Sequence, residues 1–297
     1  MSNVFGTDTS HWTGNIDFVK MASRGVKFNI TKGSDINHTT KQLFVDAKAE
    51  INTHRAKEVG ILTGLYHWLQ MYREGGEQYW YHRRTIYDKV KPDFPAILDF
   101  EEKRSIGNND YLYRAQQFLE TAEAHDEKGR KPIIYTGEWF LKGFPLSKLK
   151  FLGRYPLWFA RYTKPTADPF KWTILYKPYV NQIWDTWTFW QYSSSGDKTY
   201  YGTDGAVDEN LFNGSLEELC AFLKVGAAPE PEPTPEQPPS VTKTYRVNAP
   251  DGLRVRTAPG GAQIASLKHG TVVSGAEQGD WVKLDAYSAK AYLEAQQ

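Results

Sequence analysis

The sequence contains a single cysteine, Cys220, which excludes a framework of internal disulfide bonds. Cys220 lies in the apolar helical run 216–223, where we expect it to be a small core residue. No apolar run approaches the length of a transmembrane helix, so we expect no membrane insertion. Residues 1–10 lack both a basic start and an apolar segment, so we expect no signal peptide and synthesis in a reducing cytoplasm.

Strong charge of either sign is also missing. The net charge of +1 provides no general basis for binding nucleic acid or an anionic membrane. The sequence has no His-Glu-x-x-His or paired-Cys spacing, no Gly-x-Ser-x-Gly elbow and no phosphate-binding Gly-Lys-Ser/Thr loop. We therefore expect no metal, no cofactor and no nucleic-acid partner. Aromatic residues are plentiful, with 10 Trp and 18 Tyr, and they suit either a large core or a carbohydrate-binding cleft.

The hydrophobic pattern of the first 225 residues predicts an α/β fold. Strands are expected at 4–10, 26–31, 61–69, 97–100, 132–137, 156–162, 188–192 and 205–210. Helices are expected at 17–24, 41–59, 74–90, around 112–122 and at 215–223. Alternating strands and helices favour a parallel sheet, and eight such strands can close into a barrel. Convincing helices follow only the early strands.

One short strand, 97–100, carries the clearest chemical signal. Because side chains alternate across a strand, Asp99 and Glu101 are expected beside one another on the same face. Two neighbouring carboxylates repel, which raises the proton affinity of one of them. A protonated acid beside an ionised partner is what cleavage of a glycosidic bond requires. The alternative interpretation is a strand end whose acids simply face water.

Other strand ends carry residues that would meet this pair. In an α/β barrel the reacting groups lie at the carboxyl ends of the strands. Asp8 and Asp208 are acids at such positions, and four more polar or aromatic residues occupy comparable ones: Tyr66, Tyr135, Trp190 and Gln191. A structural role fits Tyr135 and Trp190 equally well.

The last part of the chain has a different pattern. Residues 226–242 form a Pro/Glu-rich stretch, whose composition is typical of an extended linker. Residues 243–297 alternate apolar and polar residues between Gly-containing turns, which predicts a small all-β domain.

Seven segments, in order over residues 4–212, closely resemble the glycoside hydrolase family 25 muramidases, the Chalaropsis-type lysozymes common in phage endolysins. The matching segments are Gly6–Trp12, Gly64–His67, Leu98–Glu101, Ile134–Thr136, Leu157–Tyr162, Trp190–Ser194 and Val207–Asn210. The stretch 29–33 departs from the family, which usually has a more hydrophobic strand there and an acidic residue shortly after.

This resemblance implies a catalytic domain over residues 1–225, an irregular TIM-like (β/α)5(β)3 barrel. Its implied reaction is hydrolysis of the β-1,4 bond between N-acetylmuramic acid and N-acetylglucosamine in bacterial peptidoglycan. Glu101 matches the general acid, and Asp99 matches the residue that stabilises the transition state or orients the substrate's acetamido group. Asp8 and Asp208 match further cleft carboxylates. Contacts with the substrate are expected from Trp12, Tyr66, Tyr135, Trp190 and Gln191.

Residues 243–297 resemble bacterial SH3-like cell-wall-binding modules through the segments 252–259 and 279–284. The closing Gly-Trp strand of those modules is absent. The absent signal peptide, the single cysteine and the lytic fold together suggest an endolysin-type enzyme that reaches the cell wall after holin-type release, and we expect it to be a monomer. Two alternatives remain: a non-catalytic glycan-binding protein on the same barrel, or a glycosidase for another N-acetylhexosamine polymer such as chitin.

Overall fold

The computed structural model describes residues 3–102, 106–162, 183–226, 243–256, 263–278, 281–284, 287–289 and 293–295. The chain divides into two compact units, residues 1–230 and 231–297. Apart from Gly226, the predicted linker lies outside the described residues. Among the helices within these ranges, none combines the length and the apolar character needed to cross a membrane.

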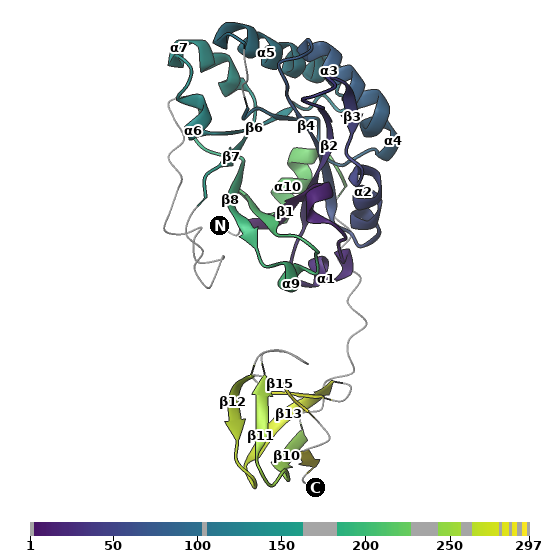
Figure 1. The fold of residues 1–297 in the computed structure, drawn as a ribbon, viewed down its shortest axis with the longest axis vertical. Helices are drawn as coiled ribbons and strands as arrows, with labels where there is room; N and C mark the ends of the chain where they lie inside the picture. Colours follow the sequence, from purple (N-terminus) through teal and green to yellow (C-terminus); the bar gives the residue numbers. More distant parts are fainter. Residues whose placement is uncertain are drawn as a thin grey trace. The chain divides into compact units, whose positions relative to one another are not determined.

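The first unit is built on a closed sheet, which confirms the predicted barrel (Figure 1). In ring order from β1 the described strands are β1 (Val4–Thr9), β2 (Phe28–Ile36), β4 (Leu62–Trp68), β5 (Ile97–Asp99), β6 (Ile133–Gly137), β7 (Leu157–Ala160), β8 (Phe189–Gly196) and β9 (Val207–Phe212). Neighbours from β1 round to β8 are parallel, whereas β9 is antiparallel to both β8 and β1 and closes the ring.

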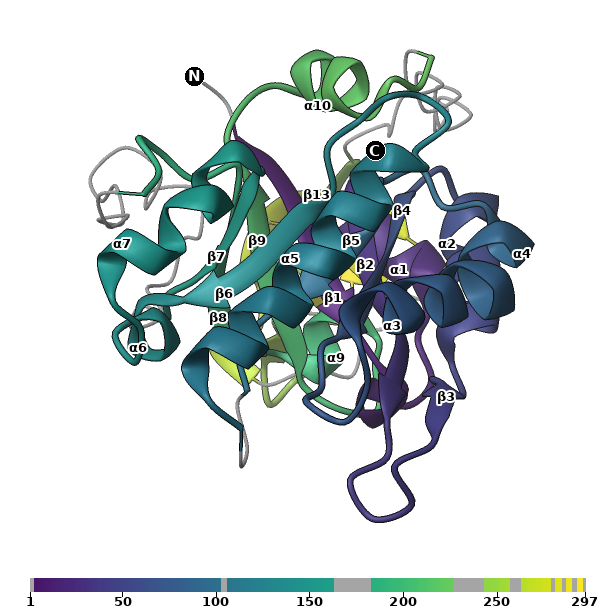
Figure 2. The same cartoon turned by 90° about the horizontal axis from the view of Figure 1, so that it is seen from above.

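Helices α2 to α7 lie around the outside of this ring (Figures 1 and 2). The described helices are α1 (Phe18–Ser23), α2 (Ala49–Glu58), α3 (Gly75–His82), α4 (Asp88–Val90), α5 (Asn108–Ala124), α6 (Glu138–Leu141), α7 (Leu146–Leu149), α9 (Lys198–Tyr201) and α10 (Leu216–Leu223). A π-helical segment, Arg83–Tyr87, joins α3 to α4, and 3-10 turns occupy His11–Thr13 and Lys150–Arg154. The helices after β6 are short, in agreement with the expected loss of regular helices in the later part of the barrel.

One predicted helix is shorter than its pattern indicated. Within the predicted helix 41–59, the structure has strand β3 (Leu43–Val45), and α2 begins only at Ala49. Strand β2 runs past the barrel to Ile36, and β3 pairs with this extension in an antiparallel register. The backbone of the projecting β2 end thus offers hydrogen bonds that outweigh the helical spacing of the side chains.

Helix α10 fills one end of the barrel. Leu219, Cys220 and Leu223 pack into the same apolar cluster as Phe28 and Phe94 from the inside of the ring. Cys220 is only 4% exposed, as expected for a small core residue. The Ser215 hydroxyl accepts a hydrogen bond from the backbone N–H of Glu218, whose carboxylate accepts one from the N–H of Ser215, which stabilises the start of α10.

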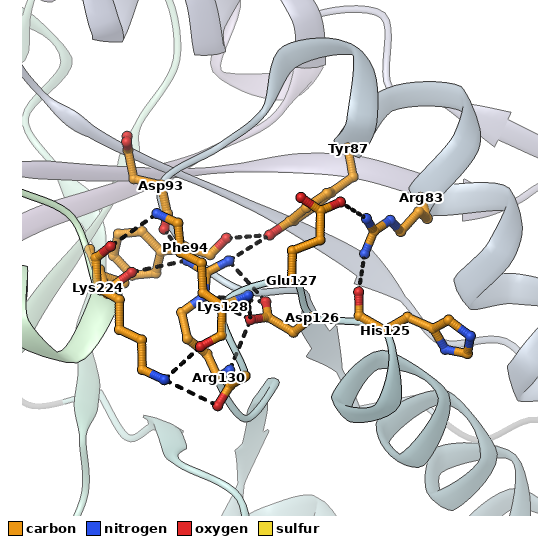
Figure 3. A network of polar contacts seen from close by, with 12 residues as sticks. Arg83, Tyr87, Asp93, Phe94, His125, Asp126, Glu127, Lys128, Arg130 and Lys224 are labelled. Atoms are coloured by element: carbon orange, nitrogen blue, oxygen red, sulfur yellow. Dashed lines mark hydrogen bonds and ion pairs between the residues drawn. The ribbon is translucent and has the colours of Figure 1, made fainter.

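A buried arginine, Arg130, binds the carboxyl-terminal end of α10 (Figure 3). The guanidinium of Arg130 donates to the backbone oxygens of Asp93 (2.5 Å) and Leu223 (3.1 Å) and pairs with the carboxylate of Asp126 at 2.9 Å. Asp93 and Arg130 precede β5 and β6, so this network lies at the amino ends of the strands. The opposite end of the barrel, where the strands have their carboxyl ends, is therefore the one left open for a site.

The second unit is all-β, as predicted. Its described strands are β10 (Lys243–Val247), β11 (Leu253–Arg256), β12 (Gln263–Leu267), β13 (Val272–Gln278), β14 (Trp281–Lys283), β15 (Tyr287–Ala289) and β16 (Leu293–Ala295). They form an antiparallel sheet in the order β12-β11-β15-β14-β13-β10-β16. Tyr245, Val247, Leu253 and Val282 make its buried core. Similarity of this unit to SH3-like modules stays a prediction.

Candidate active site

A pocket of about 390 Å³ lies at the carboxyl ends of the parallel strands. Eight of the nine residues predicted for the site line it: Asp8, Trp12, Tyr66, Asp99, Glu101, Tyr135, Gln191 and Asp208. Six of them lie on strands far apart in the sequence, whereas Trp12 and Glu101 follow the ends of β1 and β5. The antiparallel β9 contributes Asp208 from its start because that end faces the same way. Its volume is typical of pockets that bind small molecules or segments of a polymer.

Asp99 and Glu101 meet in this pocket, although strand β5 ends at Asp99. Glu101 thus lies beyond the strand, whereas a strand reaching Phe100 was expected. The alternation of side chains nevertheless continues, because the backbone N–H of Phe100 still donates to the carbonyl of Tyr135 on β6 at 2.8 Å. The ring of Phe100 consequently points into the outer core, where it contacts Phe140, and the two acids face the pocket.

Both acids hold protons more tightly than usual. Burial and the charge of Glu101 raise the pKa of Asp99 well above its ordinary range. Burial raises the pKa of Glu101 to about 7, and the charges of Asp8 and Glu102 act in the same direction. Asp99 is 4% exposed, and its Oδ1 has no hydrogen-bond partner within the described part of the protein. A buried carboxyl oxygen without a partner is available for a group of a bound ligand.

A second acidic pair forms where β1 meets β9. Asp8 and Asp208 lie directly opposite each other in the antiparallel register. Burial raises the pKa of Asp208 to about 9, reinforced by the charge of Asp8 and by a hydrogen bond between the two carboxyls. Burial also raises the pKa of Asp8, to about 6, while hydrogen bonds from Asn210 and Gln191 counteract this rise. At neutral pH, Asp208 therefore keeps its proton and shares it with an ionised Asp8.

Amide side chains hold Asp8 in place. Its Oδ2 accepts hydrogen bonds from Gln191 Nε2 at 2.8 Å and from Asn210 Nδ2 at 2.7 Å. Tyr135 donates its hydroxyl proton to Gln191 Oε1 at 2.8 Å, and Trp158 Nε1 donates to Asn210 Oδ1 at 2.7 Å. Both amides are thereby oriented with their N–H groups toward Asp8. Asn210 and Trp158 were not predicted as site residues, although both belong to segments that carry the family resemblance.

Lys32, on β2, is a charged residue of the pocket that was not among the predicted site residues. Its ammonium group donates to Asp35 Oδ2 at 2.6 Å and lies 4.4 Å from the centre of the Trp68 ring. Its positive charge counteracts the rise in the pKa of both Asp99 and Glu101. Lys32 falls in the stretch 29–33 that departs from the family pattern, and Asp35 supplies an acid shortly after it.

Of the predicted substrate-binding aromatics, Trp12, Tyr66 and Tyr135 line the pocket and Trp190 does not. Trp12 is 81% exposed at the rim of the pocket, where its ring lies 4.6 Å from that of His11. Trp190 is fully buried, packs against Trp187 and Tyr192, and is absent from the pocket lining among the described residues. Neighbouring residues of a strand point to opposite faces, so Gln191 and Trp190 cannot both face the pocket. Tyr162, 56% exposed, occupies the rim instead.

Within the described residues, no three or more His, Cys, Asp or Glu side chains are grouped so that they could hold a metal ion. The acids of the pocket are instead held by amide donors, by one another and by the charge of Lys32.

Comparisons with known proteins agree with this geometry. The sequence model for glycosyl hydrolases family 25 matches residues 7–199. The uncharacterized protein YegX of Escherichia coli strain K12 is 31% identical over 225 residues, which cover 74% of this chain and 73% of YegX. Lysozyme M1 of Streptomyces globisporus is 27% identical over 228 residues, covering 74% of this chain and 71% of that protein. The crystal structure of the bacterial lysozyme from Streptomyces coelicolor superposes with a TM-score of 0.62 at 26% identity, over 75% of this chain and 98% of that one. The chain belongs to glycosyl hydrolases family 25.

Proposed function

We propose that the protein is a muramidase that hydrolyses the β-1,4 bond between N-acetylmuramic acid and N-acetylglucosamine in bacterial peptidoglycan. The observation that carries the proposal is the Asp99–Glu101 pair, two carboxyls with raised pKa in one pocket at the barrel mouth. Membership of the family makes the chain a glycosidase. The similarity to Lysozyme M1 and to the Streptomyces coelicolor lysozyme supports peptidoglycan as the substrate.

Glu101 is assigned as the proton donor. A donor must reach the oxygen of the leaving sugar, and Glu101 is the more accessible acid of the pair. Its pKa of about 7 keeps a large share of the enzyme protonated at neutral pH, where an ordinary glutamic acid would be ionised. Asp99 lies deeper, and its unpartnered Oδ1 is suited to accept a hydrogen bond from the N–H of an acetamido group.

The remaining polar groups of the pocket position these two acids and the sugar. Asp8 raises the proton affinity of Glu101 through its charge. Tyr66 and Tyr135 form the pocket wall with Trp158, whose ring centroid lies 4.6 Å from that of Tyr135. This wall restricts water around the reacting bond and strengthens the electrostatic interactions there.

The test is a comparison of Glu101→Gln with the wild type. The substitution keeps the shape of the side chain and removes the transferable proton, so turnover should fall by roughly two to four orders of magnitude. Reducing ends released from purified peptidoglycan measure the rate, and mass analysis of the fragments identifies the bond. A variant that clears cell walls at nearly the wild-type rate would refute the assignment.

Two other functions can be distinguished in the same assay. A glycosidase for chitin would release reducing ends from chitin and leave peptidoglycan intact. A non-catalytic glycan-binding protein would release none from either polymer. The Asp99–Glu101 pair favours catalysis over pure binding, because a protein that only binds glycan needs no pair of buried neighbouring acids with raised pKa values.

We further propose that the C-terminal unit binds the cell wall in the manner of SH3-like modules. We also propose that the enzyme accumulates in the cytoplasm and, like an endolysin, reaches the wall only after a separate protein permeabilises the membrane. Sedimentation of residues 243–297 with purified walls tests the first point, and its complete absence with walls from susceptible hosts would refute it. For the second, cytoplasmic expression should leave cells intact until the membrane is permeabilised. Export of the unmodified chain from intact cells would contradict it.

A further inference from the structure

A second hollow adjoins the catalytic pocket. It has a volume of about 240 Å³ and is lined by Glu138, Trp139, Lys142, Ala160, Arg161 and Tyr162. Tyr162 lines both the hollow and the pocket, so the two lie side by side. Its other residues come from α6 and from the end of β7, which places the hollow at the mouth of the barrel.

The surfaces that the hollow presents are mainly aromatic. Trp139 is 60% exposed and Tyr162 is 56% exposed. The charged side chains pair with one another, since Glu138 lies 3.2 Å from Lys142 and 3.9 Å from Arg161. Exposed ring faces beside paired charges fit the apolar face of a sugar ring better than they fit an ionic group.

The indole of Trp139 is also held in a defined place. A Cβ atom on Gly137 would come within 2.3 Å of Trp139 Nε1, so the ring lies directly against the backbone of β6. The neighbouring Phe140 ring packs edge-on at 5.8 Å. A ring fixed in this way loses little conformational entropy when a ligand stacks on it.

From this arrangement we infer that Trp139 and Tyr162 form an additional sugar-binding site, which takes a residue of the glycan strand beyond the sugars that flank the cleaved bond. The inference rests on the proposed muramidase function and extends it: the enzyme would prefer long strands over short ones. The pocket of about 390 Å³ holds the reacting sugars, and the adjoining hollow holds the strand as it leaves the pocket over Tyr162.

The experiment measures binding rather than turnover. Strands of alternating N-acetylglucosamine and N-acetylmuramic acid, freed of stem peptides and separated by length, are titrated into the inactive full-length Glu101→Gln protein by calorimetry. Affinity should rise when the strand becomes long enough to reach the hollow. Adding Trp139→Ala should reduce the affinity for long strands about three- to tenfold and leave that for the shortest binding strand unchanged. Trp139→Phe, which keeps a ring, should retain most of the gain.

The control is Tyr113→Ala on α5, which removes an aromatic side chain of similar exposure, 58%, that lines neither cavity. An unchanged length dependence in Trp139→Ala would overturn the inference, as would an equal loss of affinity for long strands in Tyr113→Ala. Failure of the proposed function has a different signature: long strands would bind with the expected dependence on Trp139, but wild-type protein would not cleave them.

Discussion

The raised pKa of Glu101 makes a quantitative prediction about the pH dependence of activity. Its ordinary value is 4.5, and in the pocket it is about 7. That difference corresponds to about 3 kcal/mol in favour of the protonated form. At pH 7 about half of the enzyme would carry the catalytic proton, compared with about 1 molecule in 300 for an unperturbed glutamic acid.

Activity should therefore stay high up to about pH 7 and then fall about tenfold per pH unit as Glu101 loses its proton. Asp8→Asn offers a direct perturbation, because the charge of Asp8 is one cause of the raised pKa. The asparagine oxygen can still accept the hydrogen bonds of Gln191 and Asn210. Removal of the charge should lower the pKa of Glu101 and move the alkaline limb to lower pH, whatever happens to the maximal rate.

The assay is kcat/KM on soluble glycan strands, measured from pH 4 to pH 9 at constant ionic strength. The matched control is Glu120→Gln, which removes an exposed acid on α5 and should leave the limb in place. A wild-type limb near pH 5 would show that the pocket does not raise the pKa of Glu101. An unmoved limb in Asp8→Asn would show that Asp8 does not contribute to it.

Three further predictions concern stability and the two-part design. Arg130→Met should lower the free energy of unfolding, measured in denaturant titrations, by about 3–5 kcal/mol, because it leaves the buried carboxylate of Asp126 without its partner. Arg154→Met breaks the more exposed pair with Glu123 and should lower it by at most about 1 kcal/mol. Burial lowers the pKa of His67 to about 4 and that of His82 well below its usual value. Because the unfolded chain takes up these protons below about pH 6.5, His67 alone should reduce the free energy of unfolding by about 3 kcal/mol as the pH falls from 6.5 to 4. The His67→Asn variant should lose correspondingly less stability than the wild type between pH 7 and pH 4.5. A protein ending at Val225 should keep its rate on soluble strands and lose activity mainly on intact cells, most clearly when the cells are dilute; an equal loss on both substrates would contradict a targeting role.

Local patterns in the sequence predicted what is formed locally. Asp99 and Glu101 are two residues apart, so the alternation of an extended chain suffices to bring them together. The same rule, applied to Trp190 and Gln191, would have removed Trp190 from the expected site. The pairing of Asp8 with Asp208 joins residues of the first and last barrel strands in the sequence, and only closure of the ring sets their register.

Contacts between distant segments explain the rest of the differences. Residues 43–45 carry a helical spacing, but they became a strand because β2 extends beyond the barrel and offers its edge. Lys32 lines the pocket because β2 lies between β1 and β4 in the sheet. The local sequence pattern does not predict which strands are neighbours. Family resemblance supplied the identity of the acids, whereas their proton affinities depend on burial and required the three-dimensional structure.

The attachment of α10 determines how the barrel would respond to mechanical force. The chain leaves the barrel through Val225 and Gly226, at the end where Arg130 holds the carbonyl of Leu223. There Lys128 and Lys224 also exchange hydrogen bonds, each ammonium group donating to the other's backbone carbonyl. Tension transmitted from an anchored C-terminal unit would be borne by these bonds and by the packing of α10. The strand ends that carry the catalytic acids lie at the other end of the barrel, so such tension would reach them only through the apolar core that α10 shares with Tyr66 and Tyr135.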